Sequence, residues 1–79
     1  MGRLNLKRIK VASLEDIAHW LRRNDTAPRE VMFITLGQKS GDRHIPSFAV
    51  RKVLSDHGWT PGATYTLPGN LEGHVARLG

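Results

Sequence analysis

The stretch 43–67 constrains the fold most, because it holds an Ile-Pro pair, a helical pattern, a Gly-Trp pair, a Pro-Gly pair and a strand pattern in that order. Pro46 suits the first turn of a helix, where its missing N–H costs no hydrogen bond. Val50 and Leu54 place apolar side chains on one face of that helix. Gly58 suits the left-handed residue that follows a helix end. The stretch therefore predicts a short helix followed by a strand.

The residues before position 30 predict a strand and then a helix. Apolar and polar side chains alternate over residues 3–11, and the alternation slips at Arg8, which indicates a bulge or an end. Ser13 suits the N-cap of a helix over residues 14–23, whose apolar side chains share one face. Trp20 lies beside that apolar stripe. We expect it in the core or at an interface.

The rest of the chain predicts further strands. Residues 31–36 are apolar and β-branched, which is typical of a buried strand, and a glycine-bounded loop follows them. A return strand through 44–45 would close a hairpin. The Pro-Gly pair at 61–62 predicts a turn into a strand over 63–67. A turn-rich connection then leads to a final strand over 74–78.

These patterns predict one domain over residues 1–79 of the α+β class, with a small, mainly antiparallel sheet of four to five strands packed against two short helices. Strand order stays open, because the first strand could pair with either hairpin. A chain of 79 residues buries only a modest core. A homodimer is therefore one expected way to complete it.

Positive charge is concentrated in two parts of the sequence. Twelve Lys and Arg against seven Asp and Glu give a net charge of +5. The excess lies within residues 3–10 and 39–52, and such clusters attract phosphate backbones or acidic protein surfaces. A solvated basic face without such a partner is the other interpretation. The predicted contacts with nucleic acid or with a protein partner are Arg3, Lys7, Arg8, Lys10, Lys39, Arg43, Arg51 and Lys52.

The order of elements over residues 31–78 resembles the swapped-hairpin AbrB superfamily, and the spacing Leu-x-x-x-Gly-Trp-x-x-Gly over 54–62 is closer to its SymE branch. This resemblance implies a dimer with interleaved hairpins and a basic surface that faces nucleic acid. AbrB relatives are DNA-binding regulators and antitoxins, and SymE-like proteins are implicated in RNA binding or cleavage. The matching residues are Ile45, Pro46, Val50, Arg51, Leu54, Gly62 and Gly73.

The sequence predicts no catalytic residue, no metal site and no cofactor. Its four histidines lack the spacing of metal ligands, and there is no cysteine. Phosphate-loop, nucleophile-elbow and dinucleotide motifs do not occur in the sequence. A metal-free ribonuclease could still use two histidines as acid and base. His44 and His57 are the candidates for that chemistry.

Three functions are consistent with these features. The first is a small non-enzymatic protein that binds DNA or RNA. The alternative is a phage-type inhibitor, similar to anti-CRISPR proteins, that docks on an acidic or DNA-receiving surface of a nucleic-acid-processing complex. The third is a SymE-like ribonuclease toxin. Phe48 and Tyr65 could stack on bases, although we expect them to pack in the core.

The sequence also predicts the compartment. No apolar run approaches the roughly 20 residues that a membrane helix needs, and the basic start is not followed by the apolar segment of a signal peptide. We therefore expect a cytoplasmic protein with no membrane partner.

Overall fold

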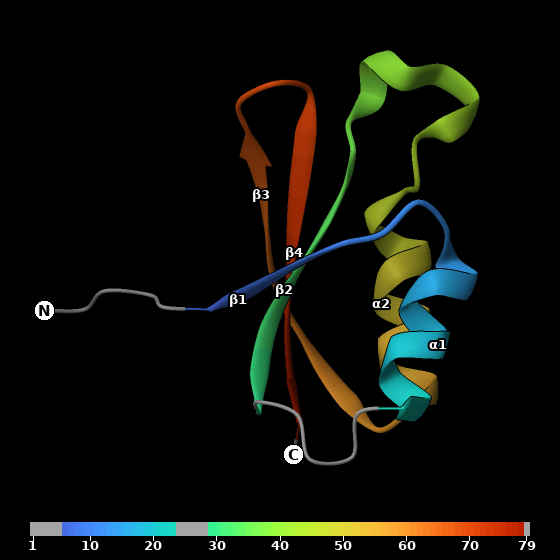
Figure 1. Ribbon diagram of the computed structural model, residues 1–79, viewed down its shortest axis with the longest axis vertical. Coiled ribbons are helices and arrows are strands. Elements are labelled where there is room, and N and C mark those ends of the chain that lie inside the picture. The colour runs from blue at the N-terminus through green and yellow to red at the C-terminus, as the bar shows by residue number, and fades with distance from the viewer. Residues whose placement is uncertain (1–5, 24–28, 79) are drawn as a thin grey trace, which may run out of the picture.

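The computed structural model describes residues 6–23 and 29–78 of the chain. Figure 1 shows these residues as a sheet with both α-helices on one side. The elements are β1 (Lys7–Lys10), α1 (Leu14–Arg23), β2 (Glu30–Leu36), the 3-10 helix η1 (Gln38–Arg43), α2 (Ser47–Asp56), β3 (Trp59–Leu67) and β4 (Leu71–Leu78). No helix within the described ranges is long and apolar enough to cross a membrane.

The four strands form one sheet in the order β1-β2-β4-β3. The β2–β4 and β4–β3 pairs are antiparallel, whereas β1 runs parallel to β2. A parallel pair needs a long crossover connection, and α1 provides it. The predicted α+β class with four to five strands and two helices is confirmed, and the described sheet has four strands. The sheet is mostly antiparallel and mixed, since β1 joins it in parallel.

The core lies between the sheet and the two helices. Ile17 of α1, Leu54 of α2 and Phe33 of β2 are each fully buried there. Trp20 packs against this core, with its ring centroid 5.5 Å from that of Phe33 and 6.0 Å from that of Trp59 in edge-on contacts. Such aromatic contacts add stabilisation beyond the area they bury. The cluster fixes both α-helices on one face of the sheet, and no described helix lies on the other face.

The predicted return strand through 44–45 is wrong. After β2 the chain forms η1, in which Gly41 has a φ of 61°, and Ile45 then enters the core in an extended segment. The position beside β2 that the return strand would take is filled by β4. Gly58 after α2 has a φ of 81°, as the sequence pattern predicts, whereas Pro46 is the N-cap of α2 and so lies one position before the first turn in which it was expected.

The predicted turn at 61–62 is also wrong, because β3 begins at Trp59 and runs through it. A bulge between Pro61 and Thr64 absorbs the Pro-Gly pair. Proline is tolerated because β3 is an edge strand, where one side of the backbone needs no partner. Glycine is favoured at 62, since a Cβ there would lie 3.0 Å from Val75 Cγ1.

Candidate functional site

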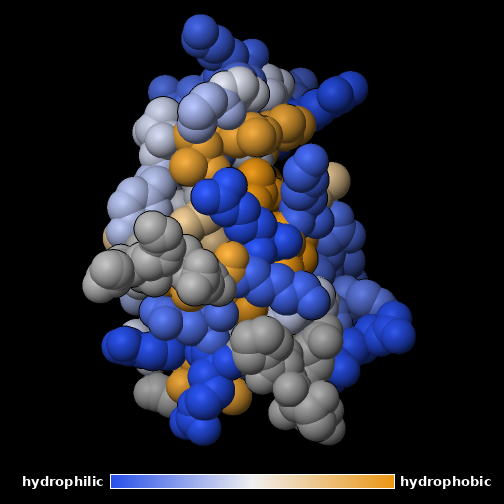
Figure 2. All heavy atoms as spheres, turned by 60° about the vertical axis from the view of Figure 1, so that its left-hand side comes forward, coloured by the Kyte–Doolittle hydropathy of each residue, from blue (hydrophilic) through white to orange (hydrophobic). Residues whose placement is uncertain are grey.

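The face of the sheet opposite the helices is the first candidate site, and we call it the open face. The side chains of this face are identified from their alternation along each strand and from the register of the strand pairs. Figure 2 shows this side, with apolar surface along its middle and strongly hydrophilic side chains across and beside it. The residues of the open face are Arg8, Lys10, Glu30, Met32, Ile34, Leu36, Thr60, Tyr65, Leu67, Leu71, Gly73, Val75 and Arg77.

Arg8 and Lys10 lie over an apolar part of the open face. They line a hollow of about 420 Å³ together with Ile34 and the turn at 67–71. Ile34 is only 5% exposed although no helix of the described ranges covers it, so neighbouring side chains shield it from water. Long basic side chains can do this, because their methylene stems pack on apolar surface while their charged ends stay in solvent.

Tyr65 presents an aromatic ring on the same face, 43% exposed. Its cross-strand partner on β4 is Gly73. A Cβ at this glycine would lie 2.5 Å from Met32 Sδ and 3.2 Å from Leu67 Cδ1, so no larger residue fits without rearrangement. The expectation that Tyr65 and Phe48 pack in the core is wrong. Phe48 is 69% exposed on α2, in the helix layer.

The predicted basic contacts do not form one surface. Arg8 and Lys10 lie on the open face at β1, whereas Lys39 and Arg43 are on η1 at another part of the fold. The α2 residue Lys52 has its Nζ 3.7 Å from Asp56 Oδ2. Arg3 lies outside the described residues. The remaining predicted contacts are Lys7 on β1 and Arg51 on α2, both exposed.

Arg77 is a basic residue of the open face that was not among the predicted contacts. It is exposed on β4 and pairs in register with Glu30 of β2 and Thr60 of β3. It was missed because it stands outside the two charge clusters. The alternation along the last strand could have placed it on the same face as Gly73 and Val75.

Hydrogen bonds connect the turn between β3 and β4 to η1 and to the residue before it. Asn70, whose φ is 59°, accepts the Gly37 N–H at its backbone oxygen over 2.7 Å. Its side-chain Nδ2 donates to Ser40 Oγ over 2.9 Å, and its Oδ1 accepts the Lys39 N–H over 3.3 Å. These bonds hold the turn that forms one wall of the hollow.

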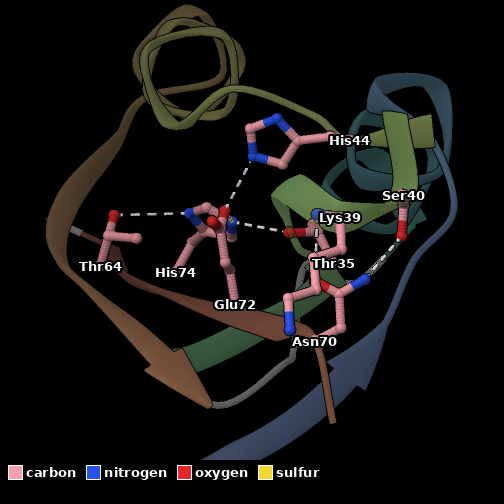
Figure 3. A network of polar contacts seen from close by, with 8 residues as sticks. All are labelled: Thr35, Lys39, Ser40, His44, Thr64, Asn70, Glu72 and His74. Atoms are coloured by element: carbon pink, nitrogen blue, oxygen red, sulfur yellow. Dashed lines mark hydrogen bonds and ion pairs between the residues drawn. The ribbon is translucent and has the colours of Figure 1, made fainter. Parts of the chain in front are cut away.

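A polar cluster on the helix side of the sheet is the second candidate site (Figure 3). His74 is 2% exposed, and its Nε2 shares a 2.9 Å hydrogen bond with Thr35 Oγ1. Its Nδ1 lies 3.4 Å from Thr64 Oγ1. Glu72 Oε1 lies 3.3 Å from His44 Nε2 and 4.0 Å from His74 Nε2. In the described part of the chain, no group of such residues is arranged to hold a metal ion.

The structure does not bring His44 and His57 together. His44 precedes α2, whereas His57 follows it and has its Nδ1 3.0 Å from the Val53 carbonyl oxygen. The ten residues of α2 separate the two histidines by about 15 Å, at 1.5 Å per residue. Two groups that far apart cannot transfer protons at one phosphate.

The surroundings of His74 favour its neutral form. Burial lowers the pKa of His74 most, and the charges of Arg51 and His44 lower it further, whereas Glu72 alone raises it. A histidine whose pKa is lower in the folded state binds fewer protons than it does unfolded. The free energy of unfolding should therefore fall as the pH drops below about 6.5, the unperturbed value.

We expect His74→Gln to flatten this pH dependence. Urea unfolding of the wild type between pH 7.5 and pH 5 should show falling stability, and the variant should show a shallower slope because position 74 no longer titrates. His19→Gln, at an exposed position on α1, is the matched control and should keep the wild-type slope. Equal slopes for all three proteins would contradict the assignment to His74.

Three comparisons, with models of protein families, with curated proteins and with solved structures, gave no match to the chain. The resemblance to the AbrB superfamily therefore stays a prediction.

Proposed function

We propose that this protein binds single-stranded nucleic acid on its open face, without catalysing a reaction. One observation carries the proposal: an exposed aromatic ring, Tyr65, shares a sheet face with Arg8 and Lys10. Rings on which bases stack, combined with cations that follow the backbone, are how sheet surfaces bind single strands. If the basic residues formed only a solvated face, the exposed ring of Tyr65 would have no assigned function.

The geometry of the sheet supports this use. Both α-helices pack on the other face, so among the described residues no helix lies between the open face and an approaching strand. Tyr65 is on one edge strand and the two cations are on the other, three strand spacings or about 14 Å away. A bound strand would therefore cross the sheet, with a base on Tyr65 and phosphates near Arg8 and Lys10. The net charge of +5 favours the encounter.

The base-stacking role predicts a clear difference between two substitutions. Tyr65→Ala should weaken binding of a labelled single-stranded oligonucleotide about tenfold or more, because stacking on an aromatic side chain contributes roughly 1–3 kcal/mol per base. Tyr65→Phe keeps the ring and should bind as the wild type does. Fluorescence anisotropy measures both affinities.

Phe48→Ala provides the matched control, since it removes an exposed ring from α2 rather than from the open face. It should leave the affinity unchanged. If Phe48→Ala and Tyr65→Ala weakened binding equally, the open face would not be the binding surface.

A salt series with single-stranded RNA, single-stranded DNA and duplex DNA tests the class of partner. We expect the affinity for single strands to fall steeply between about 50 and 300 mM salt, because phosphate contacts release counterions. A preference for duplex would contradict the stacking mode. Absence of binding to all three at low salt would contradict the proposal and favour the protein-directed inhibitor.

A further inference from the structure

β3 is an edge strand whose outer side has no partner among the described residues. An edge strand presents a row of backbone N–H and C=O groups that another strand can pair with. Proteins commonly block such edges with charged side chains, proline or bulges. The two edges of this sheet differ in how far they are blocked.

The β1 edge is protected by charge and the β3 edge is not. Lys7, Arg8 and Lys10 make three of the four residues of β1 basic. No charged side chain occurs between Trp59 and Leu71, although the protein carries a net charge of +5. The bulge between Pro61 and Thr64 protects only the first part of β3. The residues 64–67 after it are regular, and the first three of them are exposed.

A second copy of the chain fits this edge better than it fits other parts of the surface. Two copies with a charge of +5 repel each other wherever their basic residues meet, and the uncharged edge avoids this contact. A two-fold axis makes a strand its own antiparallel partner, so one short segment supplies both sides of the interface. The residues at this edge, Thr64, Tyr65 and Thr66, are of the types that form favourable cross-strand pairs.

We propose that two copies of this protein pair antiparallel through residues 64–67 of β3, which joins their two four-stranded sheets into one continuous sheet. Antiparallel pairing within a sheet puts the same face of both copies on the same side. The two open faces then form one longer surface, with the two Tyr65 rings near its centre. This dimer does not depend on nucleic-acid binding, so either proposal can fail alone.

Thr66→Lys is the sharpest test of the interface. Thr66 is exposed and pairs in register with Glu72, so a lysine there gains a favourable neighbour within the monomer. In the dimer, two added positive charges meet at the strand pair and oppose it. Ser55→Lys adds the same charge at an exposed position on α2 and serves as the matched control.

Light scattering without nucleic acid gives the mass of each protein over a range of concentrations. We expect the wild type and Ser55→Lys to reach twice the 8.8 kDa of one chain, and Thr66→Lys to stay at 8.8 kDa. A wild type that stays at the single-chain mass up to about millimolar concentration would overturn the proposal. So would a Thr66→Lys protein that dimerises as strongly as the control.

Hydrogen exchange of the wild type makes the test independent of any variant. The alternate backbone amides within 64–67 that point away from β4 should exchange more slowly as the concentration rises, because pairing protects the outer edge. Protection that grows on β1 instead, with none on β3, would place the contact at the other edge and overturn the proposal.

Discussion

Replacing Arg8 and Lys10 together by glutamate is expected to weaken binding of single-stranded nucleic acid on the order of a hundredfold at about 50 mM salt. Each phosphate contact on a single strand contributes roughly 0.7 to the slope of log affinity against log salt. Loss of two contacts should therefore lower that slope by about 1.4. The affinity at 50 mM salt falls because two phosphate contacts are lost. The two introduced carboxylates also repel the phosphates. Anisotropy titrations at several salt concentrations give both quantities.

The matched control reverses the same number of charges at another predicted contact cluster. Arg51→Glu with Lys52→Glu changes two exposed residues of α2, which packs on the other face of the sheet. This variant lowers only the general attraction and should lose much less affinity. Equal losses in the two variants would mean that net charge, and not the open face, determines binding.

Phe33→Ala is expected to destabilise the fold most, by about 3–5 kcal/mol. Phe33 is fully buried in the centre of β2, and its ring packs edge-on against Trp20 at 5.5 Å. The substitution leaves a cavity between the sheet and both helices. Since small domains have only several kcal/mol in all, the variant should be close to unfolding at room temperature. Urea unfolding measures the loss.

Phe48→Ala removes the same side chain at an exposed position and should change stability by less than about 0.5 kcal/mol. A loss at position 33 no larger than at position 48 would contradict the placement of the core between sheet and helices.

The local elements could be predicted from the sequence because their signals are local. The buried strand at 31–36, the helix that Ser13 precedes and the helix after Pro46 follow from periodicity and capping, and all three are present. Gly58 ends α2 as its conformation requires. The errors fell at Arg8, where β1 pairs in unbroken register and the predicted bulge or end is absent, and at 44–45 and 61–62. The structure at these positions depends on pairing with a strand that is distant in the sequence.

The arrangement of the sheet could not be predicted, because it depends on contacts between residues far apart in the chain. No local sequence pattern indicates that β2 pairs with β4 or that β1 runs parallel to β2. The open face depends on that order. Arg8 and Lys10 were predicted as contacts, whereas the exposure of Tyr65 and the position of Arg77 became visible only with the strand register.

Chemical-shift mapping shows directly whether single-stranded nucleic acid binds to the open face. Backbone amide spectra of the isotope-labelled protein are recorded while a short single-stranded RNA or DNA is added at low salt. We expect shifts along the strands of the open face, around Arg8, Ile34, Tyr65 and Val75, with little change on the outer surfaces of α1 and α2. Shifts centred on the helices, or no shift at any concentration of either nucleic acid, would contradict it.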